Sequence, residues 1–375
     1  MNRNPGAHAK RRPKHVLVAG VGNIGSSLIP HLARLPDVGA VTIVDRDIYE
    51  ASNVCQADIA PGDVGSAKAG VQTRRLRRLS PSLHVRPVRA DLHDIPLGMF
   101  RVDYILAALD SREARRVVNE AAWRLGVPWV DAGINADGGL MARVTVYLPA
   151  SNTPCLECAW ADTDYDLLEQ SHPCQRGIVH GAPTNAPASL GALAAALQAL
   201  ELQKLLDGDR AHALCGRQVL VDARHHTSIV SGFRRNPACR FDHGIWQVKN
   251  IKQGPNDVTL NHIIDSHSQK PGPQGRTWFR VEGRPFARRF QCPLCGRTQE
   301  TLCLLGRTPP RRGACCGRPM EPVGFDMVDR LDLTSLDRRT LALPLTRLGL
   351  RKHDVLTVGS ADGDESHYEI GGDRR

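Results

Sequence analysis

Residues 14–53, "KHVLVAGVGNIGSSLIPHLARLPDVGAVTIVDRDIYEASN", decide the fold of this chain. The apolar run "HVLVAG" predicts a buried strand, and the loop "GVGNIG" joins it directly to a helix. Glycines at Gly20, Gly22 and Gly25 let the backbone approach a phosphate, while the helix N-terminus offers free N–H groups. Asn23 opens that helix. We therefore expect Gly20, Gly22, Asn23 and Gly25 to bind a nucleotide, although tight strand–helix packing alone would also favour these glycines.

The second predicted strand, "AVTIVD", ends in a run of acidic residues. Asp45 follows Gly25 by 20 residues, a distance at which a carboxylate can hold ribose hydroxyls. Asp47 comes two residues later, and we expect it to line the same nucleotide site. A nicotinamide-dependent dehydrogenase is the usual inference from such a loop. A dehydrogenase needs a second half-site that binds the nicotinamide, and an acid or base near the transferred hydride. The sequence contains no motif for either.

Apolar runs and amphipathic helices alternate from residue 14 to about residue 246. This rhythm predicts an α/β fold with a Rossmann-like, doubly wound, mostly parallel sheet. Residues 1–13 form a basic tail ahead of it. Residues 247–277 are polar and rich in turn residues, which indicates a linker. We expect a small cysteine-containing module over 278–330 and a separate C-terminal segment over 331–375.

Composition narrows the class of protein. The 375 residues carry a net charge of +10 and include 11 cysteines. No apolar run is long enough for a bilayer and no signal peptide is present, so we expect a cytoplasmic protein without membrane contact. Cysteines in that reducing compartment indicate metal or thiol chemistry rather than disulfides. The charge is spread along the chain, which favours an acidic or phosphate-bearing partner over nucleic acid.

Further motifs follow the glycine loop in a fixed order: Ser52-Asn53, Lys68 in "GSAKAG", and Asp110 at the end of "YILAALD". With these motifs, residues 14–246 resemble the ThiF/MoeB/HesA family of adenylyltransferases, which are similar to ubiquitin-activating enzymes. The resemblance implies that ATP and Mg²⁺ activate the C-terminal glycine of a ubiquitin-like or sulfur-carrier protein ending in Gly-Gly. It also implies a homodimer, with a conjugating enzyme or sulfur donor as a further partner.

The resemblance implies a role for each matching residue. Lys68 would lie along the phosphates, Asp110 would hold Mg²⁺ directly or through water, and Asn53 would bind phosphate or ribose. Arg115 matches another family position, as a catalytic residue. The residues alone leave simpler alternatives open: a surface lysine for Lys68, a helix N-cap for Asp110 and a turn residue for Asn53.

The chain departs from the family pattern at one position. Members usually carry an arginine after the Ser-Asn-Leu step, and Gln56 stands there in this sequence. Arg46, Arg112 or an arginine of the basic tail could supply a cation at the γ-phosphate. The sequence does not choose among them.

Two cysteines in "CLEC", Cys155 and Cys158, have metal-ligand spacing. Relatives carry a second such pair later in the chain, where this sequence has Cys239 and His243. The resemblance therefore implies a structural Zn²⁺ site of three cysteines and one histidine. A redox role for the first pair is the alternative.

Cys174 lies in the chain between the Cys155–Cys158 pair and Cys239. The segment around it resembles the crossing loop in which related enzymes carry a reactive cysteine. Its thiolate could accept the activated carboxyl as a thioester or take part in persulfide chemistry. An idle loop thiol is the simpler alternative.

The C-terminal module contains a second set of cysteines. Cys292 and Cys295 in "CPLCG" precede the adjacent pair Cys315 and Cys316, a pattern that resembles a zinc ribbon. Cys303 is an alternative ligand, because adjacent cysteines are an unusual second half. Three functions stay open: an adenylyltransferase, an NAD(P)-dependent dehydrogenase, and a non-catalytic nucleotide-binding zinc scaffold.

Overall fold

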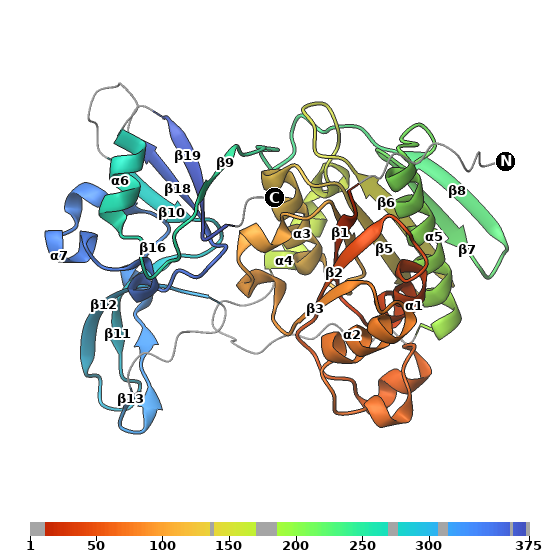
Figure 1. The fold of residues 1–375 in the computed structure, drawn as a ribbon, viewed down its shortest axis with the longest axis horizontal. Coiled ribbons are helices and arrows are strands. Elements are labelled where there is room, and N and C mark those ends of the chain that lie inside the picture. The colour runs from red at the N-terminus through yellow and green to blue at the C-terminus, as the bar shows by residue number, and fades with distance from the viewer. Residues whose placement is uncertain are drawn as a thin grey trace. The chain divides into compact units, whose positions relative to one another are not determined.

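The computed structural model describes residues 12–135, 139–169, 186–268, 277–306, 314–360 and 363–372. These residues divide into two compact units (Figure 1). The first unit comprises residues up to Leu92 together with Phe100–Ile245. The second comprises His93–Met99 and Trp246 onward. Among the described residues, no helix is both long and apolar enough to cross a membrane.

One eight-stranded sheet organises the first unit, in the order β3-β2-β1-β4-β5-β6-β7-β8. The strands from β3 to β5 are parallel, and β6, β7 and β8 continue the sheet antiparallel. This confirms the predicted doubly wound α/β fold. The strands are β1 (Lys14–Ala19), β2 (Val38–Val44), β3 (His84–Val88), β4 (Tyr104–Ala107), β5 (Trp129–Asn135), β6 (Met141–Tyr147), β7 (Arg217–Asp222) and β8 (Thr227–Gly232).

Helices cover both faces of this sheet (Figure 1). The helix after β1 connects β1 to β2, on one side of β1 in the sheet. The helix after β4 connects β4 to β5, in the opposite direction across the sheet. Right-handed crossovers therefore place these two helices on opposite faces. Residues of the first, second and fifth helices share one apolar core with the strands, including the fully buried Leu28 and Leu202. The helices are α1 (Asn23–Leu32), α2 (Lys68–Leu79), α3 (Arg112–Leu125), α4 (Asp162–Glu169) and α5 (Ala188–Asp207).

The second unit has a five-stranded sheet of its own, in the order β17-β10-β18-β19-β9. The residues expected to form a linker, 247–277, include β9 (Val248–Ile251) and α6 (Leu260–Ser268). The expected module and C-terminal segment share this sheet through β10 (Thr277–Val281), β17 (Leu331–Asp332), β18 (Val355–Ser360) and β19 (Glu365–Ile370). The boundaries differ because Ile263, Phe279 and Leu356 belong to one buried core, which turn-rich sequence around α6 concealed.

A smaller sheet in the same unit carries the second group of cysteines. Its strands are β11 (Phe286–Gln291), β12 (Thr298–Leu304), β15 (Glu321–Pro322) and β16 (Met327–Val328). Beside it lies the short hairpin of β13 (Ala314–Cys315) and β14 (Arg318–Pro319). The remaining helix is α7 (Arg338–Leu341).

Residues 93–99 join this second unit although they lie between β3 and β4 in the chain. The N–H of Gly98 donates to the carbonyl of His353 at 2.9 Å. A Cβ at Gly98 would lie 2.5 Å from Oε1 of Glu369 and 2.7 Å from the His353 carbonyl oxygen. Glu369 is buried and bonded to the His353 ring, so neither neighbour can move aside freely.

We therefore expect Gly98→Ala to destabilise the second unit by about 1–3 kcal/mol, the cost of overpacking a tight site. Urea unfolding should show an earlier midpoint for this variant. Gly62→Ala is the matched control, because a Cβ there meets nothing within 4 Å. Equal midpoints for the two variants would contradict the tight contact at Gly98.

Candidate nucleotide site and metal centres

The glycine loop lies at the switch point of the sheet, between β1 and β4. At such a point the two adjacent loops diverge and leave a crevice for a ligand. Gly20 has φ +86°, and a Cβ there would lie 2.6 Å from the carbonyl oxygen of Ala108. A Cβ on Gly25 would lie 2.0 Å from the Gly20 carbonyl oxygen, so both glycines are required by close packing.

Gly22 is different, because a Cβ there would meet nothing within 4 Å. Gly22 is also the N-cap of α1, and no side chain caps this helix end. Helix N-terminal N–H groups that lack a capping side chain are available to an anion. Open space and free donors at one point fit the phosphates of a nucleotide.

Asp45 lies at the carboxyl end of β2 and faces this loop. Its Oδ2 accepts from the Val21 N–H at 2.8 Å, and its Oδ1 accepts from the Asp47 N–H at 2.9 Å. Burial raises the pKa of Asp45, while nearby Lys68 and these two N–H groups oppose the rise. Backbone N–H groups thus hold both side-chain oxygens of Asp45 beside the glycine loop.

Lys68 begins α2 and points to the same end of the sheet. Its Nζ lies 3.3 Å from Oδ2 of Asp47, and its backbone N–H donates to the Asp47 carbonyl at 3.0 Å. The structure therefore brings Asp45, Asp47 and Lys68 together. Asp110 is exposed beyond β4. The pKa of Arg46, the residue between the two aspartates, is raised against the effect of burial by its hydrogen bond and charge pairing with Asp91, and to a smaller extent by Asp47 and Asp110.

Arg46 and Arg112 each have an acidic partner in the first unit. Arg46 NH1 lies 2.6 Å from Asp91, and its Nε lies 3.6 Å from Asp47. Arg112 lies 3.1 Å from Asp164 of α4. Of these two arginines, Arg46 is the one that contacts the acidic run at the glycine loop.

Two predicted site residues, Asn23 and Asn53, make contacts of another kind. Asn23 donates to the carbonyls of Ala186 and Pro187 at 3.0 and 3.4 Å, which ties α1 to the start of α5. Asn53 accepts from the Glu50 N–H at 2.9 Å as a local cap. Neither of these contacts joins the side chain to another residue predicted to bind the nucleotide.

Arg115 belongs to a buried charge network on β5. Its Nε donates to Asp131 at 2.9 Å, and Arg143 donates to the other carboxylate oxygen at 2.7 Å. Asp131 is fully buried, so the two arginines neutralise a charge that would otherwise be costly. Here Arg115 has a structural contact that the spacing of motifs did not indicate.

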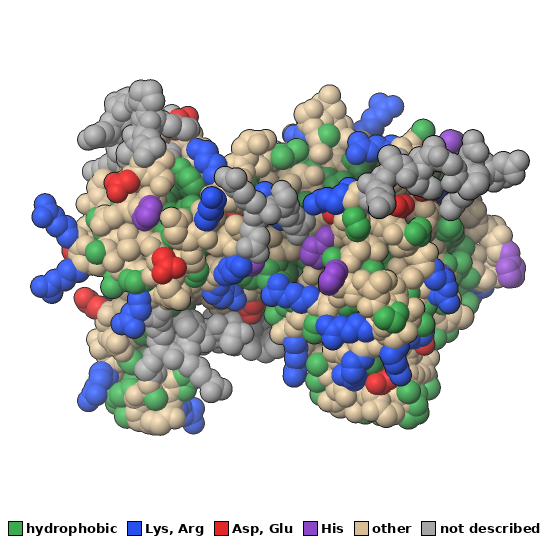
Figure 2. Space-filling model, in the orientation of Figure 1, with side chains coloured by type: hydrophobic (Ala, Val, Ile, Leu, Met, Phe, Trp, Pro, Cys, Tyr) green, Lys and Arg blue, Asp and Glu red, His purple; other side chains and the backbone are tan. Residues whose placement is uncertain are grey.

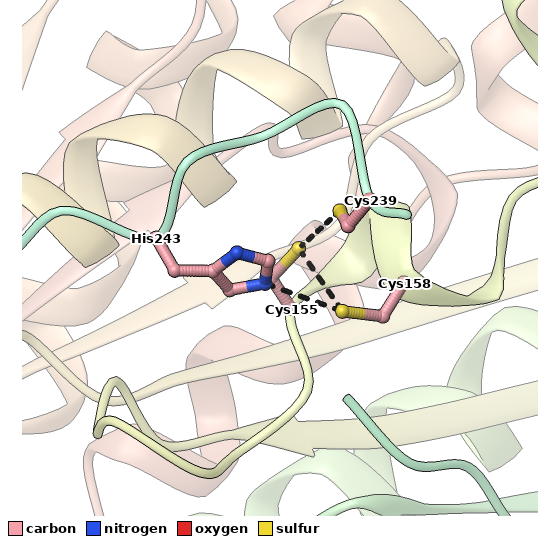
Figure 3. Close-up of side chains that lie close together, drawn as sticks. All are labelled: Cys155, Cys158, Cys239 and His243. Atoms are coloured by element: carbon pink, nitrogen blue, oxygen red, sulfur yellow. Dashed lines mark hydrogen bonds between the residues drawn. The ribbon is translucent and has the colours of Figure 1, made fainter. Parts of the chain in front are cut away.

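The first cysteine group comes together as the pattern predicted (Figure 3). The ligand atoms of Cys155, Cys158, Cys239 and His243 all lie within 4.8 Å of one another. Cys155 Sγ is 3.8 Å from the Sγ of both Cys158 and Cys239, and Cys158 Sγ is 3.2 Å from His243 Nε2. Sulfurs bound to one tetrahedral Zn²⁺ lie about 3.8 Å apart. Donor types and spacing therefore fit zinc.

The surroundings of this group also suit a structural centre. His243 is buried with φ +60°, an uncommon conformation that persists only where its neighbours fix it. The Trp123 ring meets the His243 ring edge-on, with centroids 4.8 Å apart. The hydrogen bond from Cys155 lowers the pKa of Cys158, which favours the thiolate form that binds metal.

The second cysteine group consists of Cys292, Cys295, Cys315 and Cys316, again with ligand atoms within 4.8 Å. Adjacent cysteines both reach it because Cys316 and Gly317 have φ +54° and +74°. Positive φ at both central residues is typical of a type I′ hairpin turn, here between β13 and β14. The alternative ligand, Cys303, is fully buried in the adjacent apolar core and is not part of this group.

The two groups differ in exposure, so we expect them to differ in metal lability. Cys155, Cys158 and His243 are buried, whereas Cys295 and Cys316 are exposed. A chelator should therefore remove zinc from the second group first. The test follows zinc release with a colorimetric indicator in wild-type protein and in Cys295→Ser. The fast phase should disappear in that variant; a fast phase that persists would contradict the assignment.

Cys174 lies outside the described residues, so the structure does not place the predicted reactive cysteine. Tyr49 and Gln72, by contrast, are site residues that the sequence analysis missed. Both are fully buried and polar; the Tyr49 hydroxyl donates to Val21 of the glycine loop, and Gln72 donates to Tyr49. One available signal was the position of Gln72 four residues after Lys68, on the same face of α2.

Positive charge gathers on the face over α2 and β3 (Figure 2). Four arginines are exposed there: Arg74, Arg77, Arg78 and Arg86. Lysine and arginine in such number attract anionic ligands and acidic partners. This surface accounts for part of the net charge of +10.

Fold and site together define a Rossmann-like α/β protein with two cysteine-rich groups that could each hold a metal ion. A model of the ThiF family matches residues 5–241, and the chain belongs to the ThiF family. The second unit follows the matched residues for the most part, since its main segment begins at Trp246.

Curated relatives match mainly this family domain. The SAMP-activating enzyme E1 of Haloferax volcanii is 28% identical over 241 residues, covering 63% of this chain and 82% of that protein. The sulfur carrier protein adenylyltransferase of Thermus thermophilus is 30% identical over 239 residues, covering 63% and 84%. Human ubiquitin-like modifier-activating enzyme 7 is 32% identical over 177 residues, but this chain spans only 17% of its length.

Among solved structures, the crystal structure of E. coli MccB with ATP aligns with 60% of this chain and 66% of that chain. Sequence identity is 22% and the TM-score is 0.49. At this TM-score the likeness carries no argument about the site.

Proposed function

We propose that this protein uses ATP and Mg²⁺ to adenylate the C-terminal glycine carboxylate of a small ubiquitin-like or sulfur-carrier protein. The observation that carries the proposal is the convergence of Asp45, Asp47 and Lys68 on an open glycine loop. The names of the Haloferax and Thermus relatives support it, since one activates SAMP and the other adenylates a sulfur carrier protein.

The chemistry explains why such residues are needed. A carboxylate oxygen of the carrier attacks the α-phosphorus of ATP, an acyl–phosphate bond forms, and pyrophosphate leaves. Both reactants are anions, so the site must neutralise charge and hold them in line. Lys68 would supply positive charge at this point, and the start of its helix beside the Asp47 carbonyl supports that role.

Mg²⁺ would be held by Asp110, an exposed carboxylate at the end of the loop after β4. Carboxylates and phosphate oxygens are the ligands that Mg²⁺ prefers, and the ion would screen the charge of the phosphates. Asp45 would hold the ribose, and the N–H groups of the glycine loop would hold phosphate. Family members usually have an arginine at the position of Gln56. In this proposal Arg46 would take over the role of that arginine and supply a cation at the γ-phosphate.

Two metal centres and a partner copy complete the proposal. Zn²⁺ at Cys155, Cys158, Cys239 and His243 would fasten the segment after β6 to the segment after β8. A second Zn²⁺ would hold the hairpin of Cys315 and Cys316 against the knuckle of Cys292 and Cys295. We also propose a homodimer, which size-exclusion chromatography with light scattering would test.

The decisive experiment measures ATP–pyrophosphate exchange with small proteins that end in Gly-Gly. We expect exchange that depends on the carrier and on its free C-terminal carboxylate, with no hydride transfer from NADH or NADPH. A carrier with an amidated C-terminus is the matched control. Hydride transfer without exchange would favour a dehydrogenase, and ATP binding without exchange would favour a non-catalytic zinc scaffold.

Transfer to Cys174 is a further step of the proposal. Its thiolate would attack the acyl carbon of the adenylate, form a thioester and release AMP. We expect Cys174→Ala to retain pyrophosphate exchange but to form no carrier adduct that thiol reagents cleave, as seen by denaturing electrophoresis. A cleavable adduct in Cys174→Ala would assign the transfer to another group.

A further inference from the structure

Tyr49, four residues after Asp45, lies fully buried beside the glycine loop. Its hydroxyl donates to the Val21 carbonyl at 2.6 Å. Burial raises the pKa of Tyr49, so the hydroxyl stays protonated and keeps its ability to donate. A buried tyrosine hydroxyl is costly unless it has such a partner. This partner is a backbone group of the loop itself.

The hydrogen bond fixes the direction of one peptide group. The Val21 carbonyl and the Gly22 N–H belong to the same planar peptide unit and point in opposite directions. Because Tyr49 holds the carbonyl, the Gly22 N–H must point away from the Tyr49 hydroxyl. The preceding N–H, that of Val21, is held in turn by Asp45 at 2.8 Å.

The space beside Gly22 is open. Among the described residues the Gly22 N–H has no hydrogen-bond acceptor, and a Cβ on Gly22 would meet nothing within 4 Å. An outward N–H at an uncapped helix N-terminus is a donor for a phosphate oxygen. Tyr49 thus controls the donor from the buried side of the loop.

Tyr49 also connects this loop to the helix that carries Lys68. Gln72 of α2 donates to the Tyr49 hydroxyl at 2.9 Å, and Lys68 Nζ lies 5.8 Å from the Tyr49 ring centroid. The Tyr49 backbone bonds to Ser66 and Gly65, at 2.9 and 2.8 Å, directly ahead of α2. The side chain and backbone of Tyr49 therefore connect the glycine loop to the start of the helix that carries Lys68.

We propose that Tyr49 is a positioning residue for ATP, which aims the Gly22 N–H at a phosphate and sets the place of Lys68 relative to the loop. The inference rests on the proposed ATP-dependent function. Tyr49 itself contacts no substrate in this account, because it acts from the buried side of the loop through Val21 and through the start of α2.

The test compares ATP affinity, by calorimetry, in Tyr49→Phe and wild-type protein. The phenyl ring keeps the packing, while the Val21 carbonyl loses its donor. We expect about a tenfold weaker affinity for ATP, which corresponds to the contribution of one hydrogen bond, that from the Gly22 N–H to phosphate. The KM for ATP in pyrophosphate exchange should rise by the same factor, and the KM for the carrier should not change.

Tyr104→Phe is the matched control. The Tyr104 hydroxyl donates to the Leu205 carbonyl at 3.2 Å, at the start of β4 and therefore at the opposite edge of the sheet. This variant loses a bond of the same kind, and its affinity for ATP should equal that of the wild type. Thermal unfolding should show that both variants are folded at the assay temperature.

Gln72→Leu is a second probe, because it removes the donor to Tyr49 but keeps the bond to Val21. We expect a smaller loss of affinity than in Tyr49→Phe, and an equal or larger loss would assign the role to Gln72 instead. Unchanged affinity in Tyr49→Phe would overturn the proposal, as would an equal loss in Tyr104→Phe. Wild-type protein that binds no ATP would contradict the proposed function itself, so the two failures are distinguishable.

Discussion

Replacing Lys68 with alanine should lower the rate of ATP–pyrophosphate exchange by about 100- to 1,000-fold. Losses of this size follow the removal of one preorganised group that stabilises charge in a transition state. Lys68 is suited to that role because only 14% of its side chain is exposed and its Nζ lies 3.3 Å from Asp47. A charge in such a position is screened less by water than one on the surface.

The measurement is radiolabelled pyrophosphate exchange at saturating ATP, with folding checked by circular dichroism. Lys204→Ala is the matched control, since Lys204 pairs with Glu201 near the end of α5, away from the glycine loop. Its exchange rate should match the wild type. If exchange survives in a Lys68→Ala, Asp110→Ala double variant, the assignment of this site is wrong.

Cys158→Ser should release the metal of the first cysteine group and destabilise the first unit by several kcal/mol. Structural zinc contributes about 10–16 kcal/mol of binding energy in small peptides, and a folded domain that loses one ligand forfeits part of it. The loss should be large here because Trp123, Cys239 and Phe241 pack against the same group. We expect the Tm to fall by about 10 °C or more.

Metal content and thermal unfolding together test this result. Zinc per chain should fall by one equivalent in Cys158→Ser. Cys215→Ser is the matched control, because Cys215 is half-buried and belongs to neither metal-binding group. It should keep its full metal content and lose little stability. A Cys158→Ser protein with unchanged zinc would remove Cys158 from the ligand set.

The parts of the fold that sequence predicted are those governed by local pattern. Alternating apolar runs and helices predicted the order of elements in the first unit. Cysteine spacing likewise predicted the pairs Cys155–Cys158 and Cys292–Cys295, while the family resemblance implied Cys239 and His243. A Cys-x-x-Cys pair involves only four adjacent residues, so it can be recognised in the sequence without knowledge of the rest of the fold.

The domain division of the C-terminal part could not be read in the same way. Polar, turn-rich residues around Val258 and Ile263 indicated a linker, yet these two side chains are fully buried. They are buried against strands that come some twenty to one hundred residues later in the chain. Packing between segments so far apart in the chain cannot be recognised from a short stretch of sequence. Val258 and Ile263 do not belong to a long or regular hydrophobic run that would mark them as core residues.

By itself, the sequence determined that a glycine loop follows the first strand, that acidic residues follow the second, and that cysteines occur in pairs with metal-ligand spacing. Only the tertiary structure decided which polar side chains meet at the loop. It directs Asn23 toward Ala186 and Arg115 toward Asp131, and it places Tyr49 under Val21. The physical reason is that a buried polar group must find a partner, and that partner comes from a distant segment that only the folded chain brings near.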